Sequence, residues 1–300
     1  MRRHHAALML ILGTLAGAAC DSPSTSAVVP TAPTSTVAAP APPSGIAVSG
    51  KVYDTGNRPL AGATVEVVNG ASAGLKVTSL ADGSYAMRGE FDAGTQFRAT
   101  KAGYETGLRP MAPFCQQCNP NFWVYFFLAL PVAPANLAND YTVTVTADPS
   151  CTQLPGHARQ RSYTTKIVPN VSQPTSANTL FAATVDGANL VTGLTWQGLW
   201  FAVAGDYLEV SMGDLHGQPG VLEQTDVNGY FSVGGLGTTT LGSSGVSRIT
   251  TTFEGEIMHC ELRPGVAPLD AGGRFDCPAA QAISRVACQA RNHQLVLTRR

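Results

Sequence analysis

The residues of this sequence that could do chemistry lie mostly in the second half of the chain. Glu254 and Glu256 flank Gly255, and two neighbouring carboxylates can serve as the acid and base of glycoside hydrolysis. Residues i and i+2 of a strand share one face, so this use is geometrically possible. Alternation with Phe253 and Ile257 is, however, typical of the solvent-facing side of a strand. A secreted hydrolase is therefore the least favoured interpretation.

The histidines do not form a pattern typical of an active site. A serine hydrolase needs Ser, His and an acid that converge, but His157, His216, His259 and His293 are scattered and no serine lies in a nucleophile elbow. Asp214 and His216 share a turn-rich loop, but two ligands are too few for a zinc site. We predict no catalytic residue, no metal site and no cofactor, and therefore a protein that is not an enzyme.

Two tryptophans are the candidate ligand-binding residues. Trp196 and Trp200 could fill the core, or they could form an aromatic platform for a sugar ring or an apolar ligand. Their spacing of four places them on the same face of a strand only if Gly198 does not bulge.

Seven cysteines indicate disulfide chemistry. If Cys20 carries a lipid, six remain, and an even number in an oxidising compartment predicts up to three disulfides. We expect Cys115 to pair with Cys118, or one of the two to pair with a neighbouring loop. The other four cysteines would brace the C-terminal domain. These four are Cys151, Cys260, Cys277 and Cys288.

The spacing of Cys115 and Cys118 also fits a thiol–disulfide motif or half of a zinc site. A redox motif needs a helix N-terminus that lowers a thiol pKa, whereas Pro120 and an apolar segment follow here. A zinc site needs a second pair of ligands at short spacing, whereas Cys277 and Cys288 are eleven residues apart. A structural disulfide is favoured.

The first 44 residues predict export. Arg2 and Arg3 precede an apolar run that is too short to span a ~30 Å hydrocarbon core, which is typical of a signal peptide, here residues 1–19. Residues 20–44 are rich in Pro, Ser and Thr and predict a disordered tether.

The segment GAAC, which ends at Cys20, resembles the lipobox of bacterial lipoproteins. It departs from that pattern because Gly17 stands where the family prefers Leu. The resemblance implies that Cys20 becomes the N-terminus, carries the lipid and anchors the chain in the bacterial cell envelope. The alternative is an ordinary signal peptide and a secreted or periplasmic protein.

Charge excludes one class of partner. Removing Arg2 and Arg3 from the 19 basic residues leaves 17, against 20 acidic residues. This weakly acidic balance, without a basic stripe, argues against nucleic acid as a partner. Only 13% of the residues are charged and 31 are glycine, which is typical of an extracellular all-β protein.

Residues 45–132 show short strands separated by turns. The run ATVEVV alternates apolar and polar residues, the pair Asp82–Gly83 predicts a hairpin turn, and the apolar run 121–130 predicts a buried central strand. No helical period is sustained, so the pattern predicts a small antiparallel β-sandwich of about seven strands.

These residues resemble the carboxypeptidase regulatory-like domain, a transthyretin-like sandwich of the carbohydrate-binding-like fold group. The resemblance implies an accessory module that binds glycans weakly or orients a neighbour, and it implies no peptidase activity. The matching segments are SGKV (49–52), PLAGATVEV (59–67), the hairpin from Thr78 to Tyr85, and KAGY (101–104).

After a linker at 133–139, residues 140–300 again alternate as strands. Tyr141, Val143 and Val145 share one predicted face, and Asn228–Gly229 predicts a hairpin turn. About eight consecutive strands favour an antiparallel β-barrel of lipocalin-like shape, braced by disulfides, because closure removes unpaired edges. A second β-sandwich is the alternative.

The sequence thus predicts an all-β, non-enzymatic, surface-anchored binding protein. The sandwich would bind carbohydrate weakly and the barrel would hold a small ligand. The alternative is a purely structural protein that interacts with envelope proteins and has no ligand pocket. The expected partners are the membrane, through the lipid on Cys20, and carbohydrate or envelope proteins.

Overall fold

The computed structural model describes residues 45–111, 121–133, 135–170, 180–214, 218–241 and 246–300. Within these ranges the elements are strands, apart from one 3₁₀ helix, η1 (Gly156–Ala158). The chain from Pro43 to Arg300 forms one compact unit. The predictions for the signal peptide, Cys20, the tether, His216, Cys115 and Cys118 lie outside the described residues.

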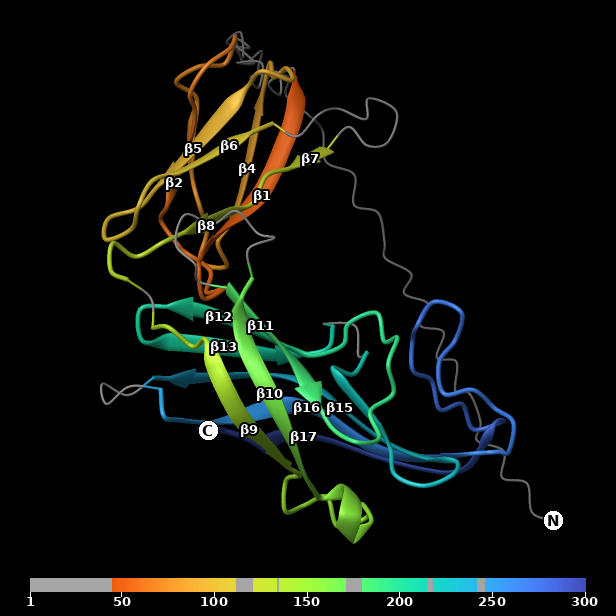
Figure 1. The fold of residues 1–300 in the computed structure, drawn as a ribbon. Coiled ribbons are helices and arrows are strands. Elements are labelled where there is room, and N and C mark those ends of the chain that lie inside the picture. The colour runs from red at the N-terminus through yellow and green to blue at the C-terminus, as the bar shows by residue number, and fades with distance from the viewer. Residues whose placement is uncertain (1–44, 112–120, 134, 171–179, 215–217, 242–245) are drawn as a thin grey trace, which may run out of the picture. The chain divides into compact units, whose positions relative to one another are not determined.

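The first part of this unit is a β-sandwich of two sheets (Figure 1). In one sheet β1 lies in the middle, between β4 on one side and β7 and β8 on the other. Its strands are β1 (Ile46–Asp54), β4 (Ser84–Gly89), β7 (Asn121–Trp123) and β8 (Phe126–Leu128). The other sheet has the order β3 (Lys76–Thr78), β2 (Thr64–Val67), β5 (Gln96–Thr100) and β6 (Gly107–Pro110).

The inward side chains of the two sheets form one core. Alternate residues are buried in β1 and β2, as the period of two predicts, and Phe97 and Phe126 fill the centre between the sheets. Pairing differs from the antiparallel prediction, because β7 and β8 both run parallel to β1. Among the described residues they pair with β1 alone, so the apolar run 121–130 is an edge of the sheet and not a central strand.

The second part is a closed antiparallel barrel of eight strands, as the sequence predicts. The ring has the order β13–β12–β11–β10–β9–β17–β16–β15 and closes through pairing of β13 with β15. Figure 1 shows the long β16 and β17 side by side in it. The strands are β9 (Asn139–Thr146), β10 (Gln160–Pro169), β11 (Leu180–Asp186), β12 (Leu199–Ala204), β13 (Tyr207–Met212), β15 (Gly229–Thr240), β16 (Arg248–Leu262) and β17 (Ala282–Arg299).

Side chains fill the interior of this barrel. The inward residues of all eight strands, large aromatic rings among them, belong to one continuous core. An eight-stranded barrel has an interior just wide enough for such side chains or for one small ligand, and here the side chains take that space. Five of these rings are Tyr141, Phe181, Phe201, Phe231 and Phe253.

A ninth strand, β14 (Val221–Gln224), lies outside the ring and pairs with the first half of β15. Its Glu223 is buried, receives a hydrogen bond from the Tyr163 hydroxyl at 2.8 Å, and forms an ion pair with Arg161. Both partners belong to β10, so the contacts of the buried Glu223 tie β14 to another strand of the barrel. Breaking one partner of such a pair is costly, because the remaining charge is left buried.

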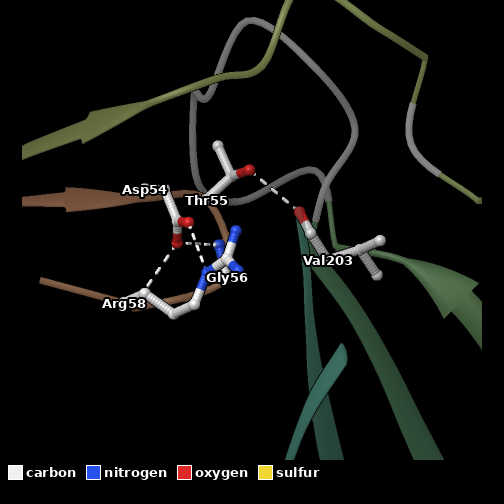
Figure 2. A network of polar contacts seen from close by, with 5 residues as sticks. All are labelled: Asp54, Thr55, Gly56, Arg58 and Val203. Carbon is white, nitrogen blue, oxygen red and sulfur yellow. Dashed lines mark hydrogen bonds and ion pairs between the residues drawn. The ribbon is translucent and has the colours of Figure 1, made fainter. Parts of the chain in front are cut away.

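A polar turn at the end of β1 joins the sandwich to the barrel (Figure 2). The buried Asp54 carboxylate accepts hydrogen bonds from the backbone N–H groups of Gly56 and Arg58, both at 2.9 Å, and from Arg58 Nε at 2.7 Å. These bonds fix the turn that presents Thr55, whose Oγ1 donates to the Val203 carbonyl of β12 at 2.9 Å.

The four described cysteines form two disulfides within the barrel part. Cys151 is bonded to Cys288, and Cys260 to Cys277. The first joins the segment after β9 to β17, and the second holds the segment after β16 against that strand. Both brace the barrel, and all four residues are buried.

Removing the Cys151–Cys288 disulfide should cost more stability than removing Cys260–Cys277. The residues of the first pair are 137 apart and those of the second are 17 apart, so the first restricts the unfolded chain more, by about 2 kcal/mol. Urea unfolding of the two double Cys→Ala variants measures the difference. The two variants control for each other, since each removes two buried sulfurs, and equal losses would contradict the prediction.

One imidazole lies inside the barrel wall. His293 is fully buried, its Nδ1 accepts a hydrogen bond from the Asp148 backbone N–H at 3.0 Å, and its Nε2 lies 3.2 Å from the Gly255 carbonyl. Because Nδ1 is an acceptor, the proton sits on Nε2, which donates to Gly255, and the ring is neutral. Burial lowers the pKa of His293 below its ordinary value.

This depressed pKa predicts a loss of stability in acid. The folded state resists protonation of His293, so its contribution is present above the unfolded pKa, ~6.5, and is lost as the pH falls toward the folded value. We expect the melting temperature of His293→Gln to fall less than that of the wild type between about pH 7.5 and pH 5, because Gln can make both bonds without titrating. The pKa of His259 is lowered too, so some slope remains; identical slopes would contradict the prediction.

Candidate functional site: an aromatic stripe on the sandwich

Exposed aromatic rings line the outer face of the sheet edge formed by β7 and β8. Trp123, Tyr125 and Phe127 are 57%, 44% and 36% exposed. The neighbouring Tyr53 of β1 stacks on Phe127, with ring centres 5.6 Å apart. We call these four residues the aromatic stripe. Large exposed apolar surfaces of this kind mark binding sites more often than chance.

Strand alternation explains why these rings face solvent. Val124, Phe126 and Leu128 occupy the intervening positions and are buried in the sandwich core. Successive side chains of a strand point to opposite faces, so the rings at 123, 125 and 127 must point outward. Because β7 and β8 form an edge, the described strands leave that outer face uncovered.

A close backbone approach sets the position of the first two rings. The Val124 carbonyl lies over Gly50 of β1, where a Cβ atom would be only 1.8 Å from the Val124 oxygen. That oxygen accepts a hydrogen bond from the buried Tyr85 hydroxyl at 2.7 Å, and burial raises the pKa of Tyr85 above its ordinary value. The contact with Gly50 and the hydrogen bond from Tyr85 therefore fix the position of Val124, the residue between Trp123 and Tyr125.

The two rings so held are ordered relative to each other. The planes of Trp123 and Tyr125 are within 11° of parallel, with centres 6.2 Å apart. Parallel aromatic rings on an exposed strand offer a repeated apolar surface along one direction.

A shallow groove of about 660 Å³ lies beside Trp123 on the same sheet. Its floor includes the small residues Ala47, Ser49 and Ala86 of β1 and β4, and Arg88 supplies a charged hydrogen-bond donor at its side. This volume falls within the ~300–1,000 Å³ of small-molecule sites. The groove and the aromatic stripe share Trp123 and form one candidate binding surface.

The structure separates the two tryptophans that the sequence singled out. Trp200 lies on the outer face of β12, 37% exposed, whereas Trp196 is 47% exposed in the loop that precedes this strand. Gly198 between them has a φ of +108°, so the chain is not extended there. The two rings therefore do not share a strand face, and neither fills the core.

The other described His and carboxylate residues considered in the sequence lie in separate parts of the barrel. His157 and His259 meet edge to face, with ring centres 5.0 Å apart, while His293 is confined to the barrel wall. Among the described residues, no group of three or more His, Cys, Asp or Glu side chains is placed to hold a metal ion. Glu254 and Glu256 both line a hollow on the outside of the barrel.

Within the described ranges, no helix is long and apolar enough to cross a membrane.

The aromatic stripe was missed in the sequence, where the run 121–130 predicted a buried strand. Nearly every residue of this run is apolar, so the period of two that marks a half-exposed strand is hidden. One signal in the sequence could have indicated the stripe. The alternate positions 123, 125 and 127 all carry large aromatic rings, and two of these rings, Trp123 and Tyr125, have a polar atom.

Comparison with known proteins gives no family for this chain. No family model and no curated protein matches it. Among the solved structures that match is a protein of Bacteroides fragilis proposed to be membrane-associated and of unknown function, 9% identical, with 85% of this chain and 97% of that chain covered. The TM-score is 0.23, and a match at that level carries no argument about function.

Replacing Gly50 by alanine tests how the aromatic stripe is held. The added Cβ would meet the Val124 oxygen, so the connection between β7 and β8 must move away from β1, at a cost of about 2 kcal/mol or more. We expect lower stability in urea and a changed environment of Trp123 by fluorescence. Gly156→Ala is the control, because nothing lies within 4 Å of its added Cβ, and equal stability of both variants would contradict the proposed support.

Proposed function

We propose that this protein is a non-enzymatic binding protein of the bacterial cell envelope that holds a polysaccharide on the aromatic stripe of its sandwich. The observation that carries the proposal is the ordered pair Trp123–Tyr125, exposed on a sheet edge beside the groove. The resemblance of residues 45–132 to carboxypeptidase regulatory-like domains supports an accessory module of this kind.

The chemistry of the surface fits a sugar chain. Each sugar ring has an apolar face of C–H groups that packs on an aromatic ring, and its hydroxyls need hydrogen-bond partners around the rim. The rings of Trp123 and Tyr125 supply the aromatic surface for the C–H groups, and each ring also carries a polar atom at its edge. Ser49 and Arg88 of the groove supply hydrogen-bond partners for the hydroxyls.

Export and anchoring belong to the same proposal. Two buried disulfides support a location in an oxidising compartment outside the cytoplasm. The lipid on Cys20 and the tether of residues 20–44 would then hold the sandwich and the barrel at the envelope surface, where a polysaccharide is accessible.

A second candidate is a structural role in which the aromatic stripe contacts an envelope protein. The observation that favours it is the apolar character of the three exposed rings, Trp123, Tyr125 and Phe127, since aromatic residues are also enriched in protein interfaces. In that case the stripe would bury a protein surface and not sugar rings.

A glycan array and pull-down on insoluble polysaccharides test the proposal with the purified protein. We expect binding to one class of glycan, and at least a tenfold loss in the variant Trp123→Ala/Tyr125→Ala, because each lost ring is worth about 1 kcal/mol or more. Trp196→Ala is the matched control, since it removes an exposed tryptophan outside the stripe. No binding to any glycan, with capture of an envelope protein that the double variant loses, would favour the second candidate.

A further inference from the structure

The outer face of the barrel carries a separate hollow of about 230 Å³, over β15 and β16. Its position follows from Gly234, which takes an outward place in β15 between Ser232 and Leu236 and pairs with Glu256 of β16. A Cβ atom on Gly234 would lie 3.2 Å from the Cα of Pro219, so the neighbouring segment closes in over the missing side chain and forms a wall.

Ser232 places a hydroxyl group in this hollow. Ser232 is 3% exposed and lines the hollow, and its Oγ makes no hydrogen bond with any other described residue. Among the described residues, the buried side-chain atom without a hydrogen-bond partner is Thr225 Oγ1, which does not line this hollow, so the Ser232 Oγ remains accessible from the hollow. A small molecule in the hollow can therefore form a hydrogen bond with this hydroxyl.

Further polar side chains surround this hydroxyl. Ser211 of β13 and Gln289 of β17 line the same hollow, and Gln289 lies directly across from Glu256. The described contacts pair neither Gln289 nor the Glu256 carboxylate with another side chain. The hydroxyls of Ser211 and Ser232, the amide of Gln289 and the carboxylate of Glu256 are therefore available to one small molecule.

The remaining lining is apolar. Leu236, Met258 and Phe275 contribute to the walls, so an occupant needs an apolar face as well as several hydrogen-bonding groups. Charge restricts it further. Three carboxylates, those of Asp214, Glu254 and Glu256, line the hollow, which makes it unfavourable for an anion. Arg291 lies 3.4 Å from Glu254 on the exposed side.

We propose that this hollow binds a single neutral sugar residue. Its ring would pack C–H groups on the apolar wall while vicinal hydroxyls donate to Glu256 and exchange hydrogen bonds with Ser232. The volume is below the ~300–1,000 Å³ of drug-sized sites, so it admits one ring and not a chain. The inference does not rest on the proposed function, because no residue of the aromatic stripe takes part.

Isothermal titration of the purified full chain with methyl glycosides of neutral hexoses, and with glucuronic acid as the anionic counterpart, tests the proposal. We expect weak binding of at least one neutral glycoside and none of glucuronic acid. Glu256→Gln should weaken binding about tenfold or more, because hydrogen bonds to a charged group are stronger than those between neutral groups, and Ser232→Ala should weaken it about threefold or more. Glu105→Gln, an exposed carboxylate outside the hollow, is the matched control.

Two further variants make the outcome unambiguous. Trp123→Ala/Tyr125→Ala should bind the monosaccharide as the wild type does, which separates this site from the aromatic stripe. If Ser232→Ala does not fold, Gln289→Ala at an exposed position of β17 takes its place. Absence of binding by every neutral glycoside, stronger binding of glucuronic acid, or affinity unchanged in Glu256→Gln would overturn the proposal.

Discussion

Closure of the eight-stranded barrel is the constraint on which the rest of the molecule depends. Pairing of β13 with β15, and of β17 with β9, leaves no open edge in this ring, and an eight-stranded ring has room for little more than its own side chains. Once the interior is filled, recognition has to occur on outer surfaces. The barrel is in this respect a rigid support, and the expectation of a ligand inside it gives way to hollows outside it.

Glycine positions create both candidate surfaces. At Gly50 the missing side chain lets the Val124 carbonyl approach β1, which orders the rings on either side. At Gly234 the missing side chain lets the segment around Pro219 approach β15 and form a wall of the hollow.

The architecture was more predictable than the binding surfaces. Tyr141, Val143 and Val145, expected on one face from their alternation, are buried in the barrel, because a period of two is a direct consequence of strand geometry. The even number of cysteines likewise indicated bracing of the C-terminal domain, although connectivity depends on which strands lie side by side in space.

The aromatic stripe and the hollow were beyond what the sequence alone could give. Whether the apolar run around Tyr125 is central or at an edge depends on the pairing of strands far apart in sequence, which local pattern does not encode. The hollow depends on register: Gly234 matters only because it faces Glu256 and lies beneath Pro219. The sequence identified the pairs Glu254–Glu256 and Trp196–Trp200 as candidates, but it could not predict which other residues surround them.

The parallel pairing of β1 with β8 has a mechanical consequence. The chain enters the sandwich at the beginning of β1 and leaves it at the end of β8, and these two points lie at opposite ends of the paired strands. A pull between the segment before β1 and the barrel would therefore load the two strands in shear. Their hydrogen bonds would have to break together and not one after another, so the connection would resist such a pull far better than a hairpin opened from its end.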